Sequence, residues 1–291
     1  MRWWVGGCAS RRAAPRKGGI TPIETEPRPL FMPPFTKGGG PLNLRVRRQH
    51  CNRSSFAYCE KTDIVVANRG GNEHGGANYI CMNDGRGHFP SCRQLSTESA
   101  TTIAAGDING DGLPDLVVPH RDGGQSYIFI NDGKGGFAEK HPFGPAKSAT
   151  RAIALGDLNG DGRLDIVIGD EAGGGAFIYF NHGNLKFSEP MPIAEKTDIL
   201  YSIAMADMNG DGHADVVSGN EKTPGAVLIN DGTGRKFTLV RFGDNKGAVY
   251  GLAIGDVNGD GSPDIVAARS GAPSMLYLNS LALKTGPKLP R

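Results

Sequence analysis

"DINGDGLPDLVV" (residues 107–118) joins a short acidic loop to an apolar segment rich in β-branched residues. It recurs as "DLNGDGRLDIVI" from residue 157, "DMNGDGHADVVS" from 207 and "DVNGDGSPDIVA" from 256, so the copies start 50, 50 and 49 residues apart. A second signature, an apolar run that ends in asparagine, keeps nearly the same spacing. Its asparagines are Asn83, Asn131, Asn181, Asn230 and Asn279. Two independent markers with one period of about 50 residues indicate internal duplication, as in propellers and other repeat arrays.

Each repeat reads as four short β-strands separated by turns. In the second repeat these are "TTIAAGD" at 101–107, "LPDLVV" at 113–118, "YIFIN" at 127–131 and "GFAEKHPF" at 136–143. The Asn-Asp-Gly between the last two favours a tight hairpin, because Asn and Gly adopt positive φ at little cost. The repeat therefore has the pattern of an antiparallel, four-stranded unit.

One position of the first strand carries a small residue in every complete repeat. The residues there are Ala104, Ala154, Ala204 and Ala253. The innermost strand of a propeller blade lies at the crowded axis, where small side chains fit. The sequence therefore predicts an all-β fold, a β-propeller of four-stranded antiparallel blades. Five blades are visible, and a truncated seven-bladed form is the alternative to a ring of five.

The acidic loops resemble one half of an EF-hand but do not meet its requirements. An EF-hand loop needs a bidentate glutamate at position 12 and a helix on each side. Position 12 here is Val118, Ile168, Ser218 or Ala267, and the flanking segments have strand character. The EF-hand interpretation is therefore excluded.

A calcium site can be built without that glutamate, because position 9 supplies a carboxylate. Each loop offers three carboxylates, one amide oxygen and a backbone carbonyl, the hard oxygen ligands that Ca²⁺ prefers, whereas Mg²⁺ demands stricter geometry. We predict four Ca²⁺ ions as cofactors, one per loop, with a mainly structural role. The predicted metal ligands are Asp107, Asn109, Asp111, Leu113, Asp115, Asp157, Asn159, Asp161, Arg163, Asp165, Asp207, Asn209, Asp211, His213, Asp215, Asp256, Asn258, Asp260, Ser262 and Asp264, with Leu113, Arg163, His213 and Ser262 acting through the backbone carbonyl.

The pattern Asp-x-Asn-Gly-Asp-Gly-x-x-Asp followed by an apolar strand resembles the FG-GAP / VCBS repeats of integrin α-subunit-like β-propellers. The resemblance covers roughly residues 60–280. It implies calcium binding in the hairpin that joins the first two strands of a blade. It also implies an extracellular, periplasmic or cell-surface protein engaged in adhesion or in binding a protein or carbohydrate.

Both ends of the repeat array depart from the pattern. In the first repeat Asp63 holds position 9, but positions 1, 3 and 5 are Ser55, Ala57 and Cys59, so we predict no calcium there. The first repeat also lacks an inner strand, and the last lacks the turn signature of a fourth strand. We expect residues 41–60, through "LNLRV" or "SSFAYC", to supply the missing inner strand. A blade shared by both ends of the chain would then close the ring.

The charge of the chain is unevenly distributed. Residues 1–53 contain 11 Lys and Arg but 2 Asp and Glu, whereas the remainder contains 21 and 28. The repeat region therefore carries no basic patch for nucleic acid. We expect residues 1–50 to form a disordered, basic, Pro- and Gly-rich tail, residues 51–285 the propeller and residues 286–291 a short tail. An arm for anionic surfaces and a wrongly assigned start are the alternatives for the first segment.

Targeting signals and cysteines are less informative. No apolar run reaches the length of about 18 residues that indicates a transmembrane helix. The start, "MRWWVGGCAS", resembles a lipoprotein signal, but its apolar stretch is too short. The cysteines have no metal-type spacing, and a disulfide is open between Cys51 and Cys59 or between Cys81 and Cys92.

The chain contains none of the common catalytic motifs, so we expect a binding or adhesion module rather than an enzyme. The expected ligand surface is the face opposite the acidic loops. One equivalent position there, just ahead of the inner strand, holds Thr101, Arg151, Tyr201 and Tyr250. These side chains suit sugar stacking or contact with an anion or peptide, or they pack neighbouring loops. A polysaccharide lyase or hydrolase on a propeller scaffold and a purely structural repeat domain are the alternatives.

Overall fold

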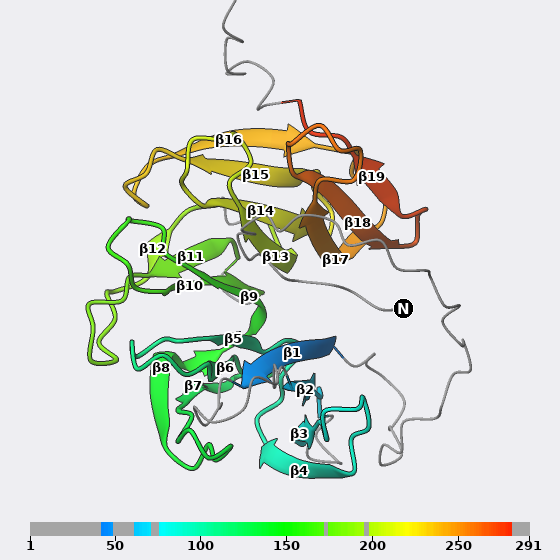
Figure 1. Ribbon diagram of the computed structural model, residues 1–291. Coiled ribbons are helices and arrows are strands. Elements are labelled where there is room, and N and C mark those ends of the chain that lie inside the picture. Colours follow the sequence, from blue (N-terminus) through cyan, green and yellow to red (C-terminus); the bar gives the residue numbers. More distant parts are fainter. Residues whose placement is uncertain (1–41, 49–60, 71–75, 172–173, 195–197, 281–291) are drawn as a thin grey trace, which may run out of the picture.

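The structure is a computed structural model that describes residues 42–48, 61–70, 76–171, 174–194 and 198–280. Within these residues, strands β1 to β19 form five separate antiparallel sheets, and no helix could cross a membrane. The sheets lie side by side as the blades of a β-propeller, with the first strand of each blade on the inside (Figure 1). The predicted all-β propeller fold is confirmed.

Strands within each blade follow the chain from the inside to the outside, and the blades are numbered here in chain order. Blade 1 contains β1 (Leu42–Arg48), β2 (Lys61–Ala67), β3 (Asn78–Met82) and β4 (Ser91–Ser96). Blade 2 contains β5 (Ala104–Gly106), β6 (Asp115–Val118), β7 (Gly124–Phe129) and β8 (Lys140–Ser148). Blade 3 contains β9 (Thr150–Gly156), β10 (Asp165–Asp170), β11 (Ala176–Tyr179) and β12 (Met191–Pro192). Blade 4 contains β13 (Leu200–Ala206), β14 (Asp215–Asn220), β15 (Gly225–Asn230) and β16 (Phe237–Phe242). Blade 5 contains β17 (Ala248–Gly255), β18 (Asp264–Ser270) and β19 (Met275–Tyr277).

The second strand of a blade is buried on both faces, which explains why its sequence is a continuous apolar run. In β6, Leu116 and Val118 pack toward blade 1 with Val65, whereas Val117 packs toward blade 3 with Ile166. Alternate side chains of one strand thus belong to the cores on both sides of its blade. Four such cores, one between each pair of consecutive blades, hold the five blades together.

Strand β1 supplies the inner strand that the first repeat lacks. It contains "LNLRV" and pairs antiparallel with β2 along its whole length, from Leu42 opposite Ala67 to Arg48 opposite Lys61. The expectation that residues 41–60 supply this strand is therefore confirmed, and β1 lies ahead of the boundary placed at residue 51. The "SSFAYC" alternative and most of both expected tails lie outside the described residues.

The expected blade shared by both chain ends is wrong within the described residues. Strand β1 pairs with the open inner edge of β2 and so completes blade 1. Blade 5 contains three strands in the described part of the chain. The physical reason lies in the sequence after Asn279, where the glycine turn that leads into the other fourth strands is missing.

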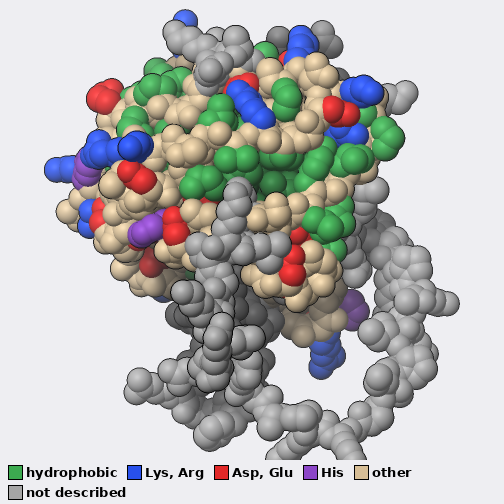
Figure 2. Space-filling view, turned by 90° about the horizontal axis from the view of Figure 1, so that it is seen from above, with side chains coloured by type: hydrophobic (Ala, Val, Ile, Leu, Met, Phe, Trp, Pro, Cys, Tyr) green, Lys and Arg blue, Asp and Glu red, His purple; other side chains and the backbone are tan. Residues whose placement is uncertain are grey.

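Blade 5 also exposes a face that the preceding blades bury against their successors. The residue at loop position 2 is Ile108, Leu158 or Met208 in blades 2 to 4, each at most 2 % exposed, whereas the equivalent Val257 is 57 % exposed. The large exposed hydrophobic side chains of the described residues all lie between Leu239 and Leu278. Viewed from the side of β15, β16 and β19, hydrophobic side chains gather in one band on the surface (Figure 2).

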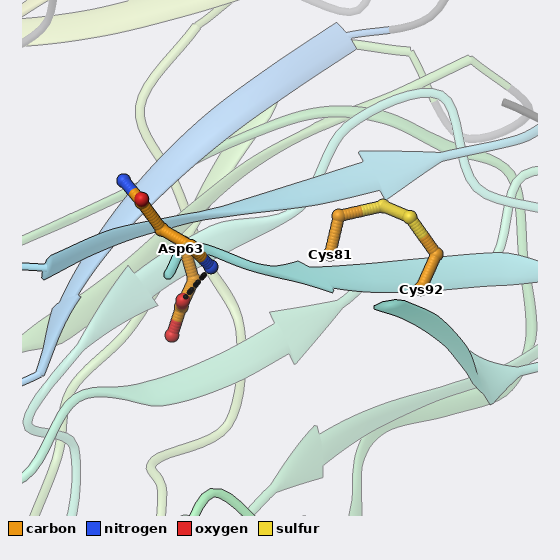
Figure 3. The surroundings of a disulfide bond; sticks show 4 residues. Asp63, Cys81 and Cys92 are labelled. Carbon is orange, nitrogen blue, oxygen red and sulfur yellow. Dashed lines mark hydrogen bonds between the residues drawn. A yellow bond between two sulfur atoms is a disulfide. The ribbon is translucent and has the colours of Figure 1, made fainter. Parts of the chain in front are cut away.

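Blade 1 contains a disulfide between Cys81 in β3 and Cys92 in β4, which lie directly opposite each other in the strand register (Figure 3). Of the two pairings that the sequence left open, this one forms, whereas Cys51 and Cys59 lie outside the described residues. In the same blade the carboxylate of Asp63 accepts a hydrogen bond from the backbone N–H of Asn83 at 2.8 Å (Figure 3). The disulfide therefore ties the two outer strands of this blade together.

Candidate metal loops and ligand face

The four acidic loops lie where the sequence predicts, because each joins the first two strands of blades 2 to 5. In the loop of blade 2, Gly110 and Gly112 adopt φ angles of 84° and 85°, in the left-handed region that other side chains disfavour. These two glycines let the loop fold back around the side chain of Asp107.

Asp107 is the acceptor around which this loop closes. Its Oδ1 accepts hydrogen bonds from the backbone N–H of Gly110 at 2.8 Å and of Asp111 at 3.0 Å, and its Oδ2 accepts one from Gly112 at 2.8 Å. Asn109 donates from Nδ2 to Oδ2 of Asp111 at 2.9 Å. Equivalent bonds recur in the other three loops, so the four loops share one geometry.

Asp115, at loop position 9, is buried where the loop enters β6. Its two carboxylate oxygens accept hydrogen bonds from the backbone N–H of Ile108 at 3.2 Å and of Asn131 at 2.8 Å. Burial is the main reason that the pKa of Asp115 is raised to about 6, and the negative charges of Asp111 and Asp107 contribute to the rise. The pKa values of the equivalent carboxyl groups in blades 3 and 4 are raised for the same reasons.

These observations test whether the loops fit a divalent cation. The described residues contain no group of three or more His, Cys, Asp and Glu side chains already arranged to hold a metal ion. The donor chemistry does fit a divalent cation. The negative charges of Asp107 and Asp111 contribute to the raised pKa of Asp115, and a bound cation would offset the repulsion between these carboxylates. The four calcium sites therefore stay a prediction. Positions 1, 3 and 5 of the first repeat lie outside the described residues, so its predicted lack of calcium also stays open.

A carboxamide from the following blade holds the acidic loops of blades 2 to 4. In blade 4, Nδ2 of Asn230 donates to the backbone carbonyl of Leu158 in the loop of blade 3 at 2.8 Å, and to that of Ala214 in its own blade at 3.1 Å. Its backbone N–H donates to Asp215 at 2.8 Å. The equivalent links between blades join Asn181 to Ile108 and Asn279 to Met208.

Sequence reasoning predicted these asparagines as hairpin residues and missed their role between blades. The hairpin role is real, because Oδ1 of Asn230 accepts hydrogen bonds from the backbone N–H of Gly232 and Gly234. The signal for the second role was the shared period. An asparagine that repeats in step with an acidic loop can contact the same point of every neighbouring loop.

Three of the four predicted ligand-face residues are placed by β-bulges. Arg151, Tyr201 and Tyr250 are each the extra, unpaired residue at a register shift of an inner strand, in β9, β13 and β17 respectively. They lie at the start of these strands, and the acidic loops follow the other end. Such bulges re-aim side chains and are common beside functional sites. We call these three residues the bulged ring. Thr101 lies outside it, ahead of β5.

The structure brings the four predicted residues into one contiguous row. The guanidinium of Arg151 lies 3.1 Å from the ring centroid of Tyr201 and 5.4 Å from that of Tyr250. The two tyrosine rings meet edge to face, with centroids 5.0 Å apart. Thr101 donates from its hydroxyl to the backbone carbonyl of Arg151 at 2.9 Å. Residues from four consecutive blades therefore touch on the face opposite the acidic loops.

Charged residues that the sequence analysis missed support this row. Glu171 pairs with Arg151 at 3.3 Å and also forms an ion pair with Arg121. The pKa of Tyr201 is raised, mainly by burial and then by a hydrogen bond to Glu221. Arg121, Glu171 and Glu221 share one repeat position, six residues after the position-9 aspartate, and this period was the signal that could have identified them.

The fold and the loops together define the class of this protein: a β-propeller whose blades carry an acidic loop in their first hairpin. The FG-GAP-like repeat family matches residues 60–118, 107–168, 157–218 and 207–267, and the chain belongs to that family. This confirms the expected resemblance to FG-GAP repeats. No curated protein matches the chain.

Solved structures with a similar fold differ widely in sequence. A lectin from Agrocybe aegerita has a TM-score of 0.51 and 19 % identity, over 83 % of this chain and 67 % of the lectin. The biofilm matrix protein Bap1 of V. cholerae has a TM-score of 0.47 and 21 % identity, over 79 % of this chain and 34 % of Bap1. BBS1N, in complex with ARL6DN, has a TM-score of 0.49 and 13 % identity, over 84 % of this chain and 69 % of that chain. At 19 % identity the likeness to the lectin shows the fold alone.

Proposed function

We propose that this protein is a calcium-stabilised propeller that acts as a binding or adhesion module for a carbohydrate or protein ligand. The observation that carries the proposal is the bulged ring, which three consecutive blades present together. Binding residues are commonly held in this way at the end of a rigid scaffold. The lectin of similar fold recognises non-reducing terminal N-acetylglucosamine, which supports carbohydrate as one of the two ligand classes.

Calcium would be held on the opposite face, by the side-chain oxygens at loop positions 1, 3, 5 and 9 and the carbonyl at position 7. The ion would supply positive charge that offsets the repulsion between the loop carboxylates. Because an asparagine of the next blade bonds to the same loop, ordering the loop also orders the contact between two blades. We therefore assign calcium a structural role, away from the ligand.

An extracellular, periplasmic or cell-surface location fits both the disulfide and the metal. The Cys81–Cys92 bridge supports an oxidising compartment, because cytosolic thiols are kept reduced. If the loops bind with the affinity of extracellular modules, a Kd of about 10⁻⁴–10⁻³ M, they would be filled outside the cell.

A binding screen with and without EDTA tests the proposal. The purified full chain is tested against glycan arrays and immobilised matrix proteins in calcium, beside the Arg151→Ala variant and the Leu239→Ala control. Leu239 is exposed on β16, the outermost strand of blade 4, whereas the ring residues lie on inner strands. We expect a ligand that Leu239→Ala retains and Arg151→Ala loses, and a lower melting temperature in EDTA. A melting temperature that EDTA leaves unchanged would contradict the calcium role. Binding that survives Arg151→Ala would contradict the ligand face.

A further inference from the structure

The next inference rests on the proposed function and concerns the chemical class of the ligand at the bulged ring. Tyr250 is the ring residue most open to a ligand, with 52 % of its surface exposed. Tyr201 and Arg151 pack against it, so the exposed ring is held on a solid support. A fixed, half-exposed aromatic ring offers a flat apolar platform.

The openness of Tyr250 follows from its place in the row. Thr101 bonds to Arg151 of the next blade, Arg151 stacks on Tyr201, and Tyr201 meets Tyr250. Each of these residues is therefore covered by its successor. Tyr250 belongs to the last blade, so within the described residues no further blade follows to cover its outer side.

The charged side chains that support this platform already form ion pairs, but their carboxylates can accept further hydrogen bonds. Arg151 forms an ion pair with Glu171, and Arg121 forms ion pairs with both Glu171 and Asp122, so each cation has a carboxylate partner. Glu171 and Glu221 are partly exposed, so their carboxylates can accept further hydrogen bonds.

This combination favours a neutral sugar over an acidic sugar or a peptide. A pyranose can lay its C–H face on an aromatic ring, and each of its hydroxyls can both donate and accept a hydrogen bond. An acidic sugar would seek an unpaired cation, but the two guanidinium groups are paired with the carboxylates of Glu171 and Asp122. A peptide or protein would usually bury a wider apolar anchor cluster, and Tyr250 is the only large exposed hydrophobic residue of the bulged ring.

We propose that the bulged ring binds a neutral pyranoside, whose apolar face stacks on Tyr250 and whose hydroxyls bond to Glu171 and Glu221. The assignment combines a platform from blade 5 with acceptors from blades 3 and 4.

Saturation-transfer NMR on the full chain in calcium tests this assignment. The probes are methyl glycosides of glucose, galactose, mannose and N-acetylglucosamine, with methyl glucuronide as the acidic comparison. The variants are Tyr250→Ala, which removes the platform, Tyr250→Trp, which keeps an aromatic face, and Leu239→Ala as the control. We expect at least one neutral glycoside to bind the wild type, Tyr250→Trp and Leu239→Ala with similar affinity, and to bind Tyr250→Ala at least about tenfold more weakly. Circular dichroism checks that all variants fold.

The outcomes separate this inference from the proposed function. Binding of glucuronide alone, or a neutral glycoside bound equally by Tyr250→Ala, would overturn the assignment. If no glycoside binds but a matrix protein binds in a way that depends on Tyr250, the saccharide class is wrong and the binding module stands. If neither sugars nor matrix proteins bind the wild type in calcium, both proposals fail.

Discussion

Replacing Asn230 with alanine tests the link between an acidic loop and the blade that follows it. Asn230 is buried, and its carboxamide makes four hydrogen bonds. Two run from Nδ2 to the carbonyls of Leu158 and Ala214, at 2.8 and 3.1 Å. Two run to Oδ1 from the N–H groups of Gly232 and Gly234, at 3.1 and 2.9 Å. Alanine removes all four bonds and leaves the backbone groups of Leu158 and Gly234, which are buried, unsatisfied.

The expected loss of stability follows from these bonds. A net hydrogen bond contributes about 0.5–1.5 kcal/mol, so four of them amount to roughly 3 kcal/mol after allowance for water that replaces some of them. For a domain of this size each kcal/mol lowers the melting temperature by about 2–4 °C, which gives a decrease of about 6–12 °C. The bond to Leu158 crosses between blades, so the variant should also weaken calcium binding by the loop of blade 3.

Asn131→Ala is the matched control. The carboxamide of Asn131 makes two hydrogen bonds, from Nδ2 to the carbonyl of Pro114 and to Oδ1 from the N–H of Gly133, both within its own blade. Thermal unfolding in calcium, followed by circular dichroism and calorimetry, should show about half the decrease of Asn230→Ala. Equal decreases in the two variants, or equal calcium affinities of the blade 3 loop in Asn230→Ala and the wild type, would refute the reasoning.

Three further predictions concern the loops and the blade faces. Asp161→Ala should weaken calcium binding more than Asn159→Ala in calorimetric titration, because it removes a carboxylate rather than a neutral oxygen that water can replace; equal losses would contradict the ligand assignment. In denaturant titration, Leu158→Ala should lower the free energy of unfolding by about 2–5 kcal/mol and Val257→Ala by less than about 1 kcal/mol. Similar losses in the two variants would show that the exposed face of blade 5 is covered in solution. In EDTA the melting temperature should rise as the pH is lowered from about 7 to about 5. The folded-state pKa of Asp115, about 6, lies above its unfolded value, so its stabilising contribution is full below the unfolded pKa and lost as the pH rises through about 6. A melting temperature in EDTA that falls or stays constant between these pH values would contradict this sign.

The blade architecture was predictable because it is encoded locally and repeated. The turn glycines, the apolar second strand and the asparagine hairpin recur in each full repeat. A wrong strand assignment in one repeat would therefore disagree with the other repeats and be recognised. The position of β1 was predictable because the first repeat lacks the sequence of an inner strand, so a segment ahead of it had to supply one. The prediction of a shared blade was wrong within the described residues, because a local sequence pattern does not show which free strand edge a segment will pair with.

The candidate ligand face was predictable only in part. Arg151, Tyr201 and Tyr250 were found because they share a repeat position, although their side chains have little in common. The bulges that place them depend on the register between two strands, which sequence alone does not reveal. The carboxylate of Glu171 was missed for a similar reason, because it pairs with Arg151 in β9, a residue 20 positions away in the chain.

We expect the two faces of the propeller to be coupled through the rigidity of the blades rather than through direct contact. In blade 3, Asp165 bonds to the backbone of Leu158 in the acidic loop and of Asn181 in the hairpin, and Asn181 bonds in turn to the loop of blade 2. Hydrogen bonds therefore join the acidic loop, the hairpin and the interface between blades into one structural unit. Arg151 lies at the other end of β9, a seven-residue strand that spans roughly 20 Å. Loss of calcium should thus weaken ligand binding by loosening the relative placement of the blades, while each ring side chain keeps its own bulge.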